Sequence, residues 1–170
     1  TNFCCRGLPL PNRDSVTDDV RALFADTLTA VAAGYAVVQC NPRGSSGYGE
    51  AHGRAVVGAW GGPDADDVLA FLDAALADPA LDAGRVGIAG GSYGGYLTAL
   101  LLTRTDRFAA AVVERALTDP VSFAGTSDIG WWFAGAHLGE DAPSPLAAAD
   151  AIRTPTLVVH SEDDERCPVE

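Results

Sequence analysis

Two patterns of apolar positions alternate along the chain. Apolar residues recur mostly at three- and four-residue steps within 16–33, which predicts an amphipathic helix that ends at Gly34. Two further helices are expected at 63–77, beginning with Pro63, and at 93–103. Short, nearly continuous apolar runs predict four strands, at 35–40, 85–90, 108–114 and 154–160.

Strands that alternate with helices over short connections are typical of an α/β fold with a mainly parallel sheet and helices on both of its faces. The aromatic segment around Trp131 and Trp132 is expected to be irregular, and a short helix is expected at 144–152. Residues 1–13 contain two prolines and show no periodicity, so an irregular segment is expected there. A single α/β unit is then expected over 14–170, because the chain is too short for two ordinary domains.

The charge of the chain argues against a nucleic-acid partner. The net charge is −12, with 11 Lys and Arg against 23 Asp and Glu, whereas binding to phosphates needs clustered basic residues. The same acidity disfavours anionic membrane surfaces. The apolar runs are also far shorter than the roughly 20 residues of a membrane span, so no membrane partner is expected.

The cysteines show neither a disulfide framework nor the spacing of zinc ligands. They are Cys4, Cys5, Cys40 and Cys167. Unpaired thiols favour a reducing, cytoplasmic compartment. Neither a metal nor a cofactor is expected.

The stretch Gly90-Gly91-Ser92-Tyr93-Gly94 matches the pattern G-x-S-x-G. In this pattern a serine is raised on a tight turn between a strand and a helix, and both neighbours are expected here. Gly90, Gly91 and Gly94 leave room for the turn. The backbone N–H of Tyr93 lies at the helix N-terminus, where an oxyanion would be stabilised. The stretch therefore predicts Ser92 as the nucleophile of an α/β-hydrolase.

In α/β-hydrolases the nucleophile is followed along the chain first by an acid and then by a histidine. The loop after the strand at 154–160 contains Asp163 and Asp164, and the residue pattern leaves both open as the acid. A solvated acidic turn is an equally good interpretation of this loop without Ser92.

No histidine of the chain fits the expected order. His52 precedes Ser92, His137 lies between the third and fourth strands, and His160 precedes the acidic loop. A serine without a general base is a weak nucleophile at neutral pH. We therefore expect the chain to be a fragment of an enzyme, truncated at both ends, with little activity of its own.

Four ordered segments resemble the catalytic domain of the prolyl oligopeptidase family, most of all its acylaminoacyl-peptidase and dipeptidyl-peptidase-like branch. The resemblance extends over about 33–170. The segments are NPRGSSGYGE (41–50), GGSYGGY (90–96), DRFAAAVVERALTDPVSFAGTSDIGW (106–131) and TPTLVVHSEDDERCP (154–168).

The resemblance implies a serine peptidase that hydrolyses short peptides, in an α/β-hydrolase domain paired with a β-propeller that is absent from this sequence. It implies Ser92 as the nucleophile and Tyr93 as the source of an oxyanion-hole N–H. In the family-like motif His-x-x-x-Asp-x-Arg-x-Pro the acid stands four residues after the histidine. Counted from His160, this position is Asp164.

The sequence departs from the family pattern in two places. The family's catalytic histidine is expected beyond the acid, where this sequence has none. The family's His-Gly-Gly-Pro-like segment is expected before the first helix, where the sequence reads RGLPLPNR. A Gly61-Gly62-Pro63 stretch occurs instead before the second helix.

Two alternative functions stay open. The same serine turn serves esters as well as peptides, so an α/β-hydrolase esterase is one alternative. A catalytically inactive hydrolase-like fragment is the other.

Overall fold

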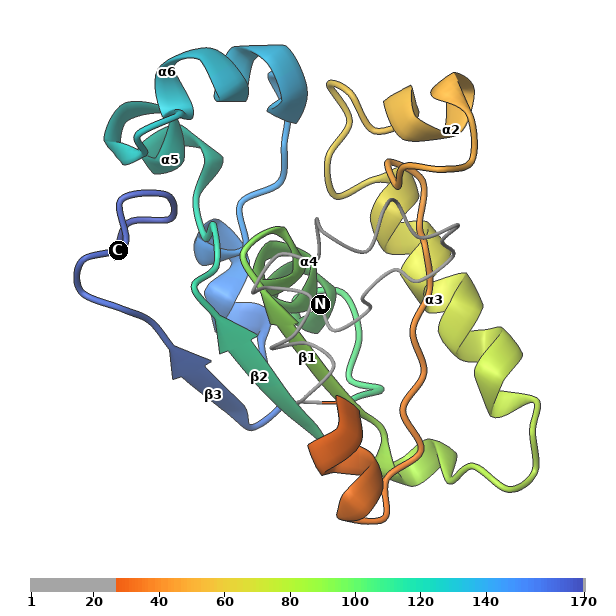
Figure 1. Ribbon diagram of the computed structural model, residues 1–170. Coiled ribbons are helices and arrows are strands. Elements are labelled where there is room, and N and C mark those ends of the chain that lie inside the picture. The colour runs from red at the N-terminus through yellow and green to blue at the C-terminus, as the bar shows by residue number, and fades with distance from the viewer. Residues whose placement is uncertain (1–26, 170) are drawn as a thin grey trace.

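The computed structural model describes residues 27–169 (Figure 1). Its sheet has three parallel strands in the order β1-β2-β3, where β1 is Gly87–Gly91, β2 is Ala110–Glu114 and β3 is Thr156–Val159. Ile88 pairs with Ala111, and Val113 pairs with Val158. The expected α/β fold with a parallel sheet is thus confirmed.

Helix α4, Tyr93–Leu102, packs against β1 and β2 and is buried along nearly its whole length (Figure 1). Its sequence is apolar on all sides, which is the pattern of a helix enclosed by other elements. Helix α3, Pro63–Leu76, adds Val68 and Leu72 to the same core. Both helices were expected from the sequence within one residue of their observed ends.

Residues 27–32 are helical, and the turn that follows contains Gly34, whose φ of 88° is the left-handed conformation that glycine favours at a helix end. The expected helix over 16–33 otherwise lies outside the described residues, as does the irregular segment 1–13. The other elements are α2 Glu50–Arg54, α5 Pro120–Thr126, α6 Gly130–Phe133, a π-helix at Ala134–Leu138, and 3-10 helices at Ala83–Arg85 and Leu146–Ala151.

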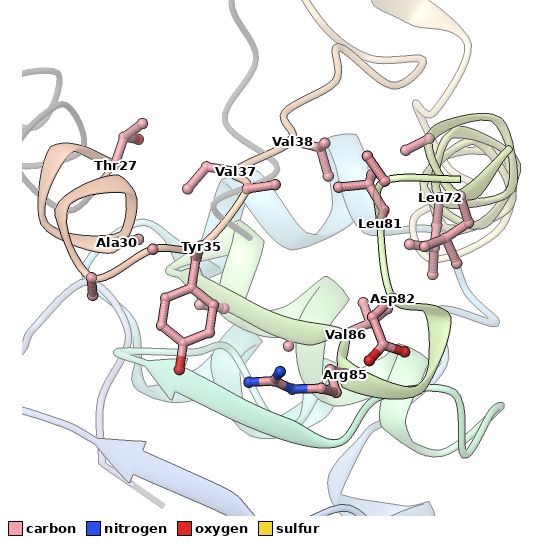
Figure 2. Close-up of a pocket in the computed structure, with 18 residues that line it drawn as sticks. Thr27, Ala30, Tyr35, Val37, Val38, Leu72, Leu81, Asp82, Arg85 and Val86 are labelled. Atoms are coloured by element: carbon pink, nitrogen blue, oxygen red, sulfur yellow. The ribbon is translucent and has the colours of Figure 1, made fainter. Parts of the chain in front are cut away.

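The prediction of a strand at 35–40 is wrong, because the structure forms no strand there. A cavity of about 570 Å³ separates this segment from β1. Val37 and Val38 lie on one wall and Val86 on the other (Figure 2). Strands pair only at a spacing of roughly 5 Å. The segment therefore has the composition of a strand, but the cavity keeps it from pairing with β1.

Strand β3 is exposed on both faces. Leu157, Val158 and Val159 are 59%, 65% and 47% exposed, whereas Ile88 of β1 and Val113 of β2 are buried. The apolar cover of the sheet is therefore centred on β1 and β2, directly beneath the turn that holds Ser92.

Candidate active site

Ser92 occupies the turn between the last residue of β1 and the first residue of α4. Its φ of 57° is left-handed, a strained conformation for a residue with a side chain. The turn is held on both sides, because the Ser92 N–H donates to the Glu114 carbonyl and the Tyr96 N–H donates to the Ser92 carbonyl, each at 3.0 Å. Strain that the surrounding structure maintains in this way is typical of a nucleophile turn.

The glycines on either side of Ser92 differ in how strictly glycine is required. A Cβ on Gly91 would lie 3.0 Å from the guanidinium of Arg115, the end of a half-exposed side chain that can shift to make room. A Cβ on Gly95 would lie 2.7 Å from both the Ala116 Cβ and the Glu114 carbonyl oxygen. Gly95, which lies just outside the G-x-S-x-G pattern, therefore allows α4 to approach the end of β2.

The other glycines of the predicted motif lie on either side of Ser92. Gly90 is buried in β1, and Gly94 is buried in the first turn of α4. Tyr93 is the first residue of α4, so its backbone N–H lies at the helix N-terminus beside the serine. The roles of these residues stay predictions.

The structure distinguishes the two candidate acids. Asp163 is exposed, whereas Asp164 is partly buried in the loop after β3. The Asp164 Oδ1 accepts hydrogen bonds from the backbone N–H of Arg166 at 3.0 Å and of Cys167 at 2.9 Å. These bonds fix the Asp164 carboxylate, while Asp163 points into solvent.

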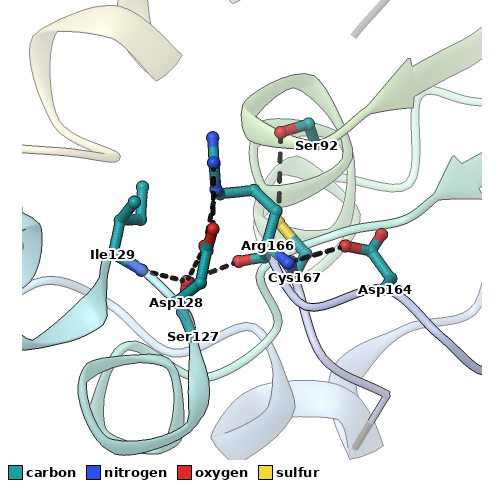
Figure 3. A network of polar contacts seen from close by, with 7 residues as sticks. All are labelled: Ser92, Ser127, Asp128, Ile129, Asp164, Arg166 and Cys167. Atoms are coloured by element: carbon teal, nitrogen blue, oxygen red, sulfur yellow. Dashed lines mark hydrogen bonds and ion pairs between the residues drawn. The ribbon is translucent and has the colours of Figure 1, made fainter.

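Cys167 connects the acidic loop to the serine. Its sulfur lies 3.9 Å from the Ser92 Oγ, and its N–H bonds to Asp164 (Figure 3). Ser92 follows β1 and Asp164 follows β3, so both residues stand at the carboxyl ends of parallel strands. The thiol is buried, and this burial raises the pKa of Cys167. The contact joins residues 75 positions apart, so no local pattern in the sequence indicates it.

A second set of contacts ties the acidic loop to the segment between α5 and α6 (Figure 3). The Arg166 guanidinium donates to both oxygens of Asp128, at 2.7 and 3.1 Å. The Ser127 hydroxyl donates to the Arg166 carbonyl at 2.6 Å, and the Asp128 N–H donates to the Glu165 carbonyl at 3.0 Å. The hydrogen bond to Arg166 lowers the pKa of Asp128 and keeps it an anion.

All three histidines are described, and none has a hydrogen bond to Ser92. His52 Nε2 bonds to the Pro42 carbonyl, and His160 Nε2 bonds to the Cys167 carbonyl. His160 also lies 3.7 Å from the Asp164 Oδ2. The ring of His137 packs against Phe133, with the ring centroids 4.5 Å apart. Each ring thus has a structural contact away from the serine hydroxyl.

Within 27–169, no cluster of three or more His, Cys, Asp or Glu side chains has the arrangement of a metal site. In the same range, no helix is long and apolar enough to cross a bilayer.

A serine on a strained strand-to-helix turn, at the carboxyl edge of a parallel sheet, defines an α/β-hydrolase. The sequence profile of the prolyl oligopeptidase family matches residues 22–170, and the chain belongs to this family. The resemblance noted from the sequence is thereby confirmed.

Three relatives illustrate the similarity. An uncharacterized peptidase of Bacillus subtilis, YuxL, is 44% identical over 157 residues, which cover 86% of this chain and 24% of the relative. The solved acylaminoacyl peptidase of Pyrococcus horikoshii is 37% identical, with a TM-score of 0.72 over 75% of this chain and 23% of that one. A puromycin-hydrolyzing peptidase of Mycobacterium tuberculosis is 33% identical, with a TM-score of 0.69 over 76% and 21%. The chain thus spans about a quarter of the length of such relatives.

Proposed function

We propose that this chain is part of the catalytic domain of a serine peptidase that hydrolyses short peptides, in the manner of acylaminoacyl or dipeptidyl peptidases. The observation that supports this function best is the position of Ser92, on a strained turn and in contact with the loop that fixes Asp164. The family membership and the names of the relatives support the same reaction class.

In the proposed mechanism, the Ser92 hydroxyl attacks a peptide carbonyl, and a histidine takes the hydroxyl proton and later passes it to the leaving amine. The three histidines of this sequence have other contacts, so we propose that the base lies outside the 170 residues. Asp164 would orient that imidazole and stabilise its cation. The Tyr93 N–H would bind the oxyanion of the tetrahedral intermediate.

The intact protein would contain a β-propeller that restricts access to short peptides, and it would act in the cytoplasm. Among the described residues the Cys167 thiol has no disulfide partner, which supports a reducing compartment. These proposals concern a protein of the full length of its relatives, of which this chain spans about a quarter.

The decisive experiment labels the full-length protein with a fluorophosphonate probe and measures turnover. We expect the probe on Ser92, and the Ser92→Ala variant should lose both labelling and peptide hydrolysis. Ser161→Ala is the matched control, because Ser161 is an exposed serine of the acidic loop, and it should behave as wild type. The isolated 170-residue chain should turn over peptides feebly, since loss of the base removes several orders of magnitude in rate.

The substrate class is tested with acyl-peptides, dipeptide amides, puromycin and p-nitrophenyl esters. Faster hydrolysis of acyl-peptides or dipeptide amides supports the peptidase. Ester turnover without peptide cleavage would instead establish an esterase. A full-length protein that is folded, unlabelled and inactive would establish a hydrolase-like protein without activity.

A further inference from the structure

Asp64, the second residue of α3, buries its carboxylate close to the serine turn. Its Oδ2 accepts hydrogen bonds from the Gly61 N–H at 3.0 Å and from the Tyr93 hydroxyl. Among the described residues, its Oδ1 has no hydrogen-bond partner. Burying a carboxylate with an oxygen that has no hydrogen bond lowers the folding stability, whereas an apolar side chain would fill the space without this penalty. Packing alone therefore does not account for an aspartate here.

The turn before α3 is shaped to bring Asp64 to this place. Gly61 has a φ of 75°, and a Cβ there would lie 2.5 Å from the Leu100 Cδ2 and 2.6 Å from the Tyr96 hydroxyl. Only glycine permits so close an approach to α4 in this conformation. This turn contains the Gly61-Gly62-Pro63 stretch noted in the sequence before the second expected helix.

The side chain of Tyr93 is held on several sides. Asp64 binds its hydroxyl, and the ring packs edge-on against Trp60, with centroids 4.5 Å apart and an interplanar angle of 68°. The ring of Tyr96 stacks on it, with centroids 6.3 Å apart. A fixed side chain limits the rotation of the Tyr93 backbone, and the N–H of this residue lies next to Ser92.

We propose that Asp64 is a positioning residue, which acts through the Tyr93 hydroxyl to fix the first residue of α4 and its N–H beside Ser92. This inference rests on the proposed function, because it assigns Asp64 to the alignment of that nucleophile. Preorganised donors lose much of their effect when misaligned by an ångström or less, so the bond influences the rate without touching the substrate.

The test uses the full-length protein with the variants Asp64→Asn, Asp64→Ala, Tyr93→Phe and Asp64→Asn/Tyr93→Phe. We expect Tyr93→Phe to lower kcat about tenfold with KM changed less than about twofold, because alignment and not binding is lost. Asp64→Ala should lose at least as much, and Asp64→Asn should recover part of the rate, because its amide oxygen can still accept from the tyrosine. The double variant should be no slower than its slower parent, since both changes remove one interaction.

Asp66→Asn is the matched control, because Asp66 is an exposed carboxylate in the same turn of α3 and should keep wild-type kcat. If Asp64→Ala fails to fold, Asp64→Asn and Tyr93→Phe decide the question. Wild-type kcat in these folded variants, even with a lowered melting temperature, would overturn the positioning role, as would additive losses. Ser92→Ala is measured in parallel: if it keeps activity, the proposed function itself fails, whatever the Asp64 variants show.

Discussion

The Ser92 Oγ lies 3.9 Å from the Cys167 Sγ, although the two residues are 75 positions apart in the sequence. Through this contact the buried thiol of Cys167 joins the acidic loop to the serine turn. The position of the loop, and with it that of Asp164, is therefore coupled to the environment of the serine hydroxyl.

Alkylation should distinguish Cys167 from Cys40. Cys167 is buried and its pKa is raised by that burial, so less thiolate is present at a given pH and access is poor. Iodoacetamide at pH 8 should therefore modify the half-buried Cys40 at least about tenfold faster, as followed by peptide mass spectrometry. The difference should vanish in denaturant, and equal rates in the folded protein would contradict the buried position.

Gly95→Ala should destabilise the protein. The added Cβ would meet Ala116 and the Glu114 carbonyl at 2.7 Å, and overpacking of this kind costs about 1–3 kcal/mol. The free energy of unfolding from urea titration measures the effect. Gly125→Ala in α5 is the control, because nothing lies within 4 Å of its Cβ. Similar losses in the two variants would show that steric contact at Gly95 is not the cause.

The Arg43–Asp67 pair should make stability depend on pH. Arg43 donates to both oxygens of Asp67, at 2.7 and 2.9 Å, and these bonds lower the pKa of Asp67 from its ordinary 3.8. A lowered folded pKa gives stability that is present above pH 3.8 and is lost as the pH falls through the folded pKa. Asp67→Asn should therefore be less stable than wild type at pH 6, with a difference that shrinks below pH 3.8.

Thermal unfolding at a series of pH values measures that difference. The control is Asp73→Asn, because Asp73 is an exposed partner of Arg107, and exposed ion pairs contribute little. A constant difference between Asp67→Asn and wild type from pH 6 to pH 3 would contradict the linkage.

Arg166→Ala should slow peptide hydrolysis in the full-length protein. The change removes both hydrogen bonds to Asp128 and loosens the loop that holds Asp164. If Asp164 is the acid of the proposed mechanism, kcat should fall about tenfold, because misplacement of a catalytic group by an ångström has effects of this order or larger. Arg107→Ala is the control, since Arg107 precedes β2 and lies at the amino end of the sheet. Unchanged kcat in Arg166→Ala would contradict the proposal that these hydrogen bonds hold the acidic loop in position for catalysis.

The parts of the structure that follow from local sequence could be predicted. β1, the turn at Ser92 and α4 adjoin in the sequence, and their apolar pattern and glycines indicate the order strand, turn and helix. Helix α5 was missed although it has a local signal: the Asp119 carboxylate accepts from the Val121 N–H, and Pro120 is the first helical residue. This cap is a local signal for a helix within the segment that was expected to be irregular.

What could not be predicted depends on residues distant in the sequence. The segment 35–40 has a strand-like composition, but its structure depends on a partner at pairing distance. The preference for Asp164 over Asp163 came from resemblance, whereas in the structure it is the backbone of Arg166 and Cys167 that binds one carboxylate. The contact between Asp64 and Tyr93 likewise needed the packing of α3 beside α4.

The exposed apolar side chains of β3 affect how the protein behaves in solution. An edge strand whose leucine and valine side chains face water is a template for pairing with other chains. The 170-residue chain on its own should therefore be colloidally unstable, and light scattering should show growing particles as the concentration rises. A lysine in place of Val158, which is 65% exposed, should slow that growth without disturbing the buried core beneath Ser92.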